Sequence, residues 1–193
     1  GFADTNGNGT NDLSEDIYVL YDVDDHNIVG IETSRGRLSG LDAIASYEMP
    51  DDLMPVDPMP FGLFGFRIDG LSANANDPAL VDISFYFPEP LPSNVKWYKY
   101  DRVTDTMTDF SSHFVKNGDS KVIMTLTDGG PGDADGVVNG VIVDPSGLSA
   151  DLTDDSGDGN GGNGSSGGSS SSEGSGGCFI STVAKIVLHR SEN

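Results

Sequence analysis

Hydrophobic and polar residues alternate in several short segments of the chain, as they do in β-strands with one buried face. In residues 80–87, for example, Val81, Ile83 and Phe85 alternate with polar neighbours. The predicted strands cover residues 17–21, 28–32, 61–68, 80–87, 95–100, 121–127 and 141–143. Because almost no helical periodicity separates them, we predict an all-β fold, an antiparallel β-sandwich of immunoglobulin-like or jelly-roll-like type over residues 17–150.

The segments between the strands are rich in turn-forming residues. The pair Asn117-Gly118 suits a tight hairpin, and the acidic residues 22–27 indicate another hairpin connection. Residues 40–46 could form a helical turn or two. Residues 49–60 contain four prolines, which predict an irregular loop whose methionines pack against the sandwich.

The acidic composition limits which kinds of molecule the chain can be expected to bind. Acidic residues outnumber basic ones 31 to 10, and the formal net charge is -21. Such a chain repels phosphates, so nucleic acid is not an expected partner. The charge indicates either a well-solvated acidic surface or a protein whose carboxylates are offset by divalent cations. No stretch has the roughly 20 apolar residues that a membrane helix needs, and no signal peptide opens the sequence.

The first residues of the chain form a strong local motif. Residues 4–15 fit the EF-hand loop pattern D-x-[DN]-x-[DN]-G-x5-E at every defined position, although no helix precedes them and a strand is predicted to follow. The expected calcium ligands are Asp4, Asn6, Asn8, Thr10, Asp12 and Glu15. We therefore predict a calcium-binding loop or spacer over residues 1–16, with a disordered Asn/Gly-rich leader as the alternative.

A second candidate calcium loop lies between residues 128 and 145. Glycines let its backbone turn tightly, and Asp133, Asp135 and Asn139 offer side-chain oxygens at alternating spacing, as a hard cation prefers. The alternative is that Asp, Asn and Gly are simply good turn formers. A strand over residues 141–143 is predicted to follow and to end at Asp144-Pro145.

Three ordered motifs resemble one family. Residues 128–145, Asp-Gly-Gly-x-Gly-Asp-x-Asp-Gly-x-x-Asn-Gly-x-Ile-x-Asp-Pro, resemble the end signature of the bacterial choice-of-anchor U domain. Residues 60–66 resemble its Pro-Tyr-Gly-Leu-x-x-Phe strand, and residues 88–100 resemble its Pro-x-Gly-x-Lys-Trp-Tyr-Lys-Tyr segment. The resemblance covers residues 17–148 and implies an extracellular module placed before a C-terminal surface-sorting signal. Residues 4–15 also resemble the calcium-binding spacer repeats of thrombospondin-type-3 modules.

The C-terminal part of the chain changes character. Residues 151–177 are acidic and then almost entirely Gly, Ser and Asn, which predicts a flexible, disordered linker. Residues 178–193 begin Cys-Phe-Ile-Ser-Thr-Val-Ala and resemble the bacterial CFI-box C-terminal signal. Cys178 is the only cysteine, which excludes an intrachain disulfide. It is a candidate attachment or modification point, or alternatively an inert thiol on a disordered end.

Catalytic motifs are missing from the sequence. His113 lies near Ser111 and Ser112, but a histidine flanked by aromatic residues is more typical of a packed or edge position than of a triad. We therefore predict no enzymatic activity. An aromatic platform of Tyr86, Trp97, Tyr98 and Tyr100 would instead indicate binding to surface glycans, unless these side chains line the core.

Taken together, these patterns predict a secreted or cell-surface module of a bacterium. The chain begins at Gly1 without Met, so we expect a processed or excised piece of a longer protein. The predicted role is that of a calcium-stabilised stalk close to the anchor, with calcium ions and cell-envelope components as partners. A carbohydrate- or protein-binding adhesin module is the alternative.

Overall fold

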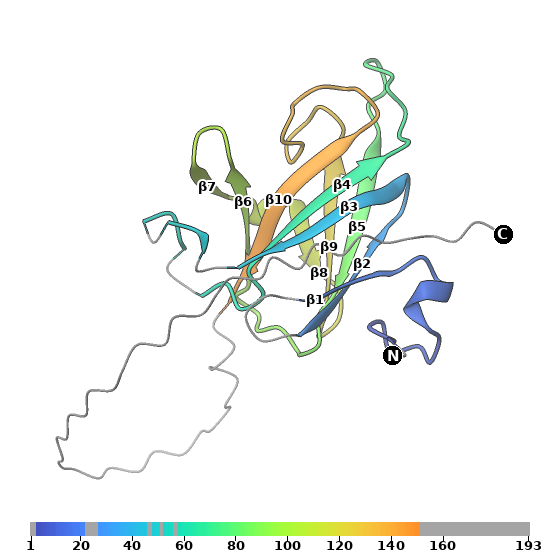
Figure 1. Cartoon of the computed structure of the whole chain (residues 1–193), viewed down its shortest axis with the longest axis vertical. Helices are drawn as coiled ribbons and strands as arrows, with labels where there is room; N and C mark the ends of the chain where they lie inside the picture. Colours follow the sequence, from blue (N-terminus) through green and yellow to red (C-terminus); the bar gives the residue numbers. More distant parts are fainter. Residues whose placement is uncertain (1–2, 22–26, 46–47, 51, 56–57, 151–193) are drawn as a thin grey trace, which may run out of the picture.

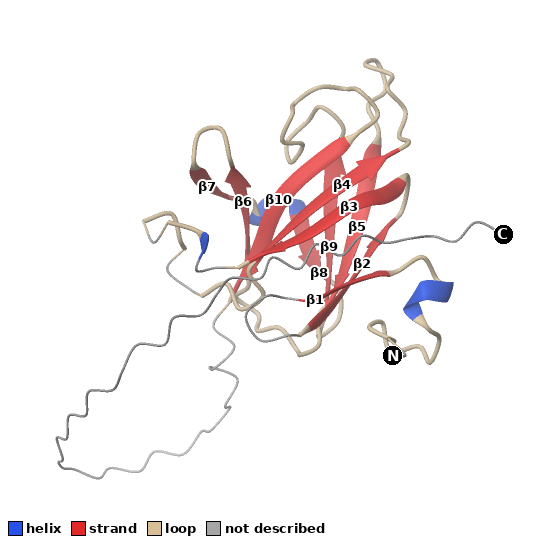
Figure 2. Ribbon diagram, viewed as in Figure 1, coloured by secondary structure: helices blue, strands red, loops and turns tan. Residues whose placement is uncertain are grey.

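Two antiparallel sheets of five strands each pack face to face as a sandwich (Figure 1, Figure 2). The computed structural model describes residues 3–21, 27–45, 48–50, 52–55 and 58–150. The predicted all-β sandwich is therefore confirmed. The predicted linker, the C-terminal motif with Cys178 and the connection over residues 22–26 lie outside the described residues.

Strands from the C-terminal half of the domain, such as β9 and β10, occupy interior positions in the two sheets. The first sheet has the order β1-β2-β5-β9-β8, and the second has the order β3-β4-β10-β6-β7. The first sheet consists of β1 (Tyr18–Tyr21), β2 (Ile28–Thr33), β5 (Leu80–Tyr86), β9 (Lys121–Thr127) and β8 (Phe114–Lys116). The second consists of β3 (Arg37–Ile44), β4 (Leu63–Asp69), β10 (Ile142–Ser149), β6 (Lys96–Asp101) and β7 (Thr106–Asp109). The short 3-10 helices η1 (Asp12–Ser14) and η3 (Ser111–His113) lie outside the sheets.

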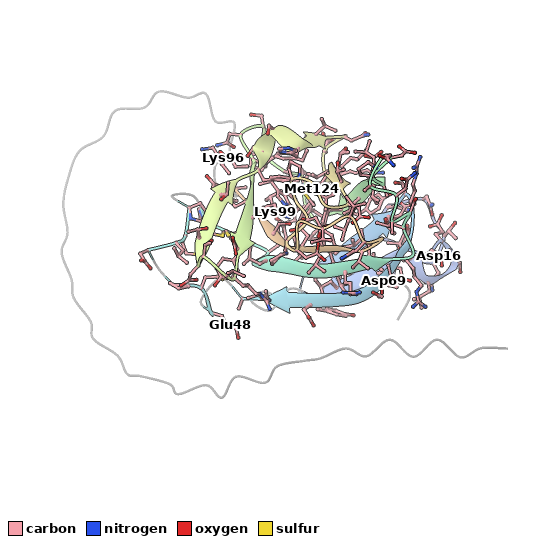
Figure 3. All side chains as sticks on the ribbon, turned by 90° about the horizontal axis from the view of Figure 1, so that it is seen from above. Asp16, Glu48, Asp69, Lys96, Lys99 and Met124 are labelled. Atoms are coloured by element: carbon pink, nitrogen blue, oxygen red, sulfur yellow. The ribbon has the colours of Figure 1, made fainter. Side chains whose placement is uncertain are left out.

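Side chains fill the space between the sheets (Figure 3), and many of those in the core are aromatic. Trp97 of β6 packs on Phe85 of β5 with ring centroids 4.7 Å apart, and Phe64 of β4 lies 5.5 Å from the same ring. All three are fully buried. The alternation in β5 and β9 places their odd and even residues, respectively, in this core, as the sequence predicts. Burial of each large apolar side chain contributes about 1.5–3 kcal/mol.

The helical turn predicted for residues 40–46 is wrong, because residues 40–44 belong to β3, which pairs with β4 from Arg37↔Asp69 to Ile44↔Leu63. The register shifts between Leu38 and Gly40, which marks a β-bulge. Leu38 packs in the core on one side of the bulge, and Leu41 and Ala43 pack against the core on the other. A bulge adds one residue and so reverses the phase of the alternation. Because of this break, the sequence of β3 shows no continuous alternation of hydrophobic and polar residues, and the strand could not be predicted from it.

The predicted end of the last strand is also wrong, because β10 continues through Asp144 and Pro145 to Ser149. Proline cannot donate a ladder hydrogen bond and is normally found at edges or strand starts. Here Pro145 aligns with Gly65 of β4, and the pairing with β6 begins only at Ser146. At Pro145 the strand is therefore paired with β4 alone, so the missing N–H group breaks no pairing with β6.

A second hydrophobic cluster covers part of the outer face of the second sheet. Met49, Met59 and Leu63 are buried there, and Met54 packs against them. This confirms that the methionines of the proline-rich loop pack on the sandwich. Leu63 lies on the face of β4 opposite the core residue Phe64, yet it is fully buried because this loop folds over the start of β4.

Close packing of that loop requires a glycine in β10. A Cβ atom at Gly147 would lie 2.4 Å from the carbonyl oxygen of Gly62 and 2.7 Å from the Met59 methyl carbon. We expect Gly147→Ala to lower the free energy of unfolding by about 1–3 kcal/mol, because overpacking must displace the backbone. Urea unfolding measures the loss. Gly40→Ala is the matched strand control, since its nearest contact would be 3.5 Å; an equal loss in both variants would contradict the explanation.

Candidate functional site

The N-terminal loop brings four of its six predicted calcium ligands together. The Glu15 carboxylate accepts hydrogen bonds from both amide groups, from Asn8 Nδ2 at 2.7 Å and from Asn6 Nδ2 at 3.2 Å. The two oxygens of Asp4 accept the backbone N–H groups of Asn8 (3.0 Å) and Gly9 (2.8 Å). Gly9 has φ +85°, which allows the sharp turn that the pattern predicts. The residues at the first, third, fifth and twelfth loop positions thus form one hydrogen-bonded cluster.

The other two predicted ligands lie differently. Asp12 is fully buried, and both of its carboxylate oxygens lie 3.0 Å from the backbone nitrogen of Thr5. Its own backbone carbonyl accepts from Glu15 and Ile17. Thr10 is exposed and donates its backbone N–H to Asn8 Oδ1 at 2.7 Å. Asp12 therefore holds the base of the loop rather than facing the Asp4–Glu15 cluster.

The loop is packed onto the edge of the first sheet. A Cβ atom at Gly30 of β2 would lie 2.0 Å from Thr5 Oγ1 and 3.2 Å from a methyl carbon of Ile17. The missing side chain at Gly30 makes room for the loop. Binding in this loop would therefore be coupled to the β1–β2 edge, which Figure 1 shows beside the N-terminal segment.

The donor chemistry of the N-terminal loop fits calcium. Carboxylate and amide oxygens and a backbone carbonyl are the ligands that this ion takes in EF-hand loops. The cluster holds two carboxylates and two amides, and no three His, Cys, Asp or Glu side chains gather anywhere in the described residues. Because affinity rises with ligand charge, such a set predicts weak binding, in the range of about 10⁻⁴–10⁻³ M typical of extracellular modules.

The second candidate loop uses its acidic side chains to close on itself. Asp133 is buried and accepts the backbone N–H groups of Gly129 (2.8 Å) and Val143 (3.2 Å). Burial raises the pKa of Asp133 above its usual value, and these hydrogen bonds partly offset that effect. Asp133 therefore ties the start of the loop to β10.

The two other predicted ligands of this loop bond to each other and to nearby backbone N–H groups. Asn139 Nδ2 donates to Asp135 Oδ2 at 2.9 Å, Asp135 Oδ1 accepts from Val137 N, and Asn139 Oδ1 accepts from Val141 N. An ion at this loop would have to displace these hydrogen bonds. The arrangement fits the turn-former alternative, and the calcium site at Asp133, Asp135 and Asn139 stays a prediction.

Two buried polar features were not singled out from the sequence. Asp128 is fully buried at the end of β9 and accepts the backbone N–H groups of Asn139 (3.2 Å) and Gly140 (2.8 Å). Lys99 of β6 and Asp144 of β10 form an ion pair of 2.6 Å inside the sandwich. The alternation in residues 95–100 does place Lys99 on the same face as Trp97, so a signal for the second feature was present.

The aromatic residues do not form one platform. Trp97 is fully buried, whereas Tyr86 lies in the first sheet and Tyr98 and Tyr100 lie in the second. Tyr86 Oη donates to Glu32 at 2.7 Å, and Tyr100 packs against the outer methionine cluster. Only Tyr98 and Tyr100 lie on one common face, the face of β6 opposite Trp97, and the glycan alternative stays a prediction.

His113 has a surface position. Its Nδ1 lies 3.0 Å from Ser112 Oγ, and its ring stacks on Phe110 at 3.9 Å. The side chain is exposed. The stacking agrees with the edge position predicted from its aromatic neighbours.

The observations define a class by fold alone, that of the antiparallel β-sandwiches. No protein-family model, curated protein or solved structure matched the chain in our comparisons. The resemblance to the choice-of-anchor U domain and the CFI-box stays a prediction. None of the helices in the described ranges has the length and hydrophobicity to cross a bilayer.

Proposed function

We propose that the chain is a non-catalytic, calcium-stabilised module of a bacterial cell-surface protein, serving as a stalk close to the anchor. The observation that carries the proposal is the cluster of Asp4, Asn6, Asn8 and Glu15 in a loop of EF-hand spacing. The net charge of -21 and the three anchor-domain-like motifs support the extracellular setting. Cys178 is proposed as the attachment point.

The residues of the N-terminal loop would act as the ion-binding element. Asp4 and Glu15 would provide carboxylate oxygens, Asn6 and Asn8 amide oxygens, and Thr10 its backbone carbonyl. The amide groups of Asn6 and Asn8 would turn their oxygens toward the centre of the cluster, where their nitrogens now bond Glu15. Bound calcium supplies positive charge that offsets the repulsion among carboxylates. Through Asp12 and Thr5 the ordered loop would hold the chain against β2.

Calcium is expected to raise the thermal stability of the full chain relative to EDTA. A ligand that binds only the folded state at 100 times its dissociation constant stabilises it by about 2.7 kcal/mol. Glu15→Gln should remove most of this gain, because it replaces the carboxylate on which both amides converge. Melting curves followed by circular dichroism at increasing free calcium measure the shift.

The matched control is Glu48→Gln, an exposed carboxylate that Figure 3 shows on the far side of the sandwich from Asp16. It should keep the full calcium shift. The double variant Asp133→Asn, Asp135→Asn tests the second loop in the same way. An unchanged melting point in calcium, or an equal shift in the Glu15→Gln variant, would refute the proposed site.

A further inference from the structure

An amine and a carboxyl group face each other inside the sandwich. Lys99 Nζ lies 2.6 Å from Asp144 Oδ1, and the exposed fractions of the two side chains are 14% and 0%. The two residues come from neighbouring central strands, since Lys99 aligns with Ser146, two residues after Asp144. Figure 3 shows Lys99 among the side chains between the sheets and Lys96 of the same strand at the margin.

The surroundings of this pair bury the carboxyl group fully and the amine for the most part, and they hold the amine in place. Lys99 Nζ lies 5.2 Å from the centroid of the Phe110 ring and donates a hydrogen bond to the carbonyl of Gly132. Asp144 aligns with Phe66, a core residue of β4. The buried Ser146 hydroxyl follows on the same side of β10 and, within the described residues, has no hydrogen-bond partner other than the Asp144 carboxyl group. The amine is therefore held beside the carboxyl group of Asp144, and the Asp133 carboxylate is a second charge that acts on both groups.

Burial also acts on the charge of both groups. Loss of solvent raises the pKa of Asp144 and lowers the pKa of Lys99, and the attraction between the two partly offsets each shift. A buried ion pair gains little over its desolvation cost. Because burial favours the neutral form of each group, a proton can pass from Nζ to Oδ1 across the 2.6 Å contact, which gives a neutral amine and a neutral carboxylic acid. These are the reactive forms of the two groups, because a protonated amine has no free electron pair.

We propose that Lys99 and Asp144 join in an intramolecular amide bond. The electron pair of Lys99 Nζ attacks the side-chain carboxyl carbon of Asp144 and forms the C–N bond. The C–O bond of the protonated carboxyl breaks, and its hydroxyl leaves with one amine proton as water. Nothing is oxidised or reduced, so no further reactant is needed. The neighbouring Ser146 hydroxyl, which lowers the pKa of Asp144, would donate a hydrogen bond to this carboxyl group while the carbon is tetrahedral.

Such a bond would link β6 covalently to β10 in a chain whose one cysteine excludes a disulfide between its own residues. Covalent links between distant residues stabilise mainly by restricting the unfolded chain. The proposal does not depend on calcium binding. It adds a second source of stability to the second sheet.

The intact mass of the denatured full-length chain tests the proposal. We expect a mass lower than that of the sequence by one water molecule, and a digest in which the peptides holding Lys99 and Asp144 stay joined. Lys99→Met should restore the sequence mass. Lys96→Met, at an exposed position of the same strand, should keep the loss of water.

A second variant, Asp144→Asn, tests the proposal even if Lys99→Met does not fold. In Asp144→Asn the same attack would release ammonia, so the mass should fall by one ammonia instead of one water. A chain that keeps its full sequence mass after purification and prolonged incubation, with Lys99 and Asp144 in separate peptides, would overturn the proposal. The pair would then be a structural ion pair only.

Discussion

Replacing Trp97 with Ala is expected to lower the free energy of unfolding by about 3–5 kcal/mol, the usual cost of removing a buried aromatic side chain. Trp97 is fully buried and touches rings from both sheets, at 4.7 Å from Phe85 and 6.4 Å from Phe64. The cavity would open at the centre of the aromatic core, where packed neighbours can collapse only in part. Because a small domain has only about 5–15 kcal/mol of stability, such a loss is a large share of the total.

Urea unfolding followed by circular dichroism measures this effect, since the variant lacks the only tryptophan of the chain. Tyr98→Ala is the matched control, because Tyr98 is the next residue in β6 and is only half-buried on the opposite face. Trp97→Phe should cost less than Trp97→Ala, as the indole N–H has no hydrogen-bond partner among the described residues. Equal losses for Trp97→Ala and Tyr98→Ala would show that the core is not centred on Trp97.

Asp128→Ala should cost about 3 kcal/mol or more. The Asp128 carboxylate is fully buried and accepts the backbone N–H groups of Asn139 and Gly140, which precede β10. Hydrogen bonds to a charged group contribute about 1.5–3 kcal/mol each, and buried donors left without a partner carry a desolvation penalty. The variant would therefore loosen the loop that leads into the central strand of the second sheet.

The same unfolding measurement compares this variant with Asp135→Ala in the same loop. Asp135 is exposed, so water can replace its hydrogen bonds and the loss should be much smaller. The loss of stability for Asp128→Asn should lie between those of the two alanine variants. The amide oxygen can still accept one backbone N–H group, whereas the amide nitrogen would face the other N–H group. A larger loss at Asp135 than at Asp128 would contradict the assigned roles.

Much of the fold could be predicted from the sequence because burial on one face leaves a period of two. Val81, Ile83 and Phe85 in β5 and Val122, Met124 and Leu126 in β9 all lie in the core as expected. The bulge after Leu38 reversed the period in β3, so that strand was predicted as helical turns. The strands β7 and β8 are short, and none of their residues is fully buried, so burial leaves no alternating pattern in their sequences.

The candidate sites were predictable only in part. Ligand spacing identified the N-terminal loop as a unit, but it could not show that Asp12 turns inward to Thr5. In the second loop the same residue types serve both ion binding and turn formation, and only the contacts of Asp133 distinguish its structural use. The Lys99–Asp144 pair depends on β6 and β10 being neighbours, which is a property of the topology and not of either segment.

The position of β10 decides how the sandwich would carry a mechanical load. As the last described strand it leads directly to the C-terminal part of the chain, yet it lies between β4 and β6 and bonds to both. A pull along this strand from its end would load the hydrogen bonds on both sides at once, in shear. An edge strand such as β7 or β8 could be peeled away one bond at a time. The chain therefore leaves the described domain through a strand that is bonded on both sides and not through an edge strand.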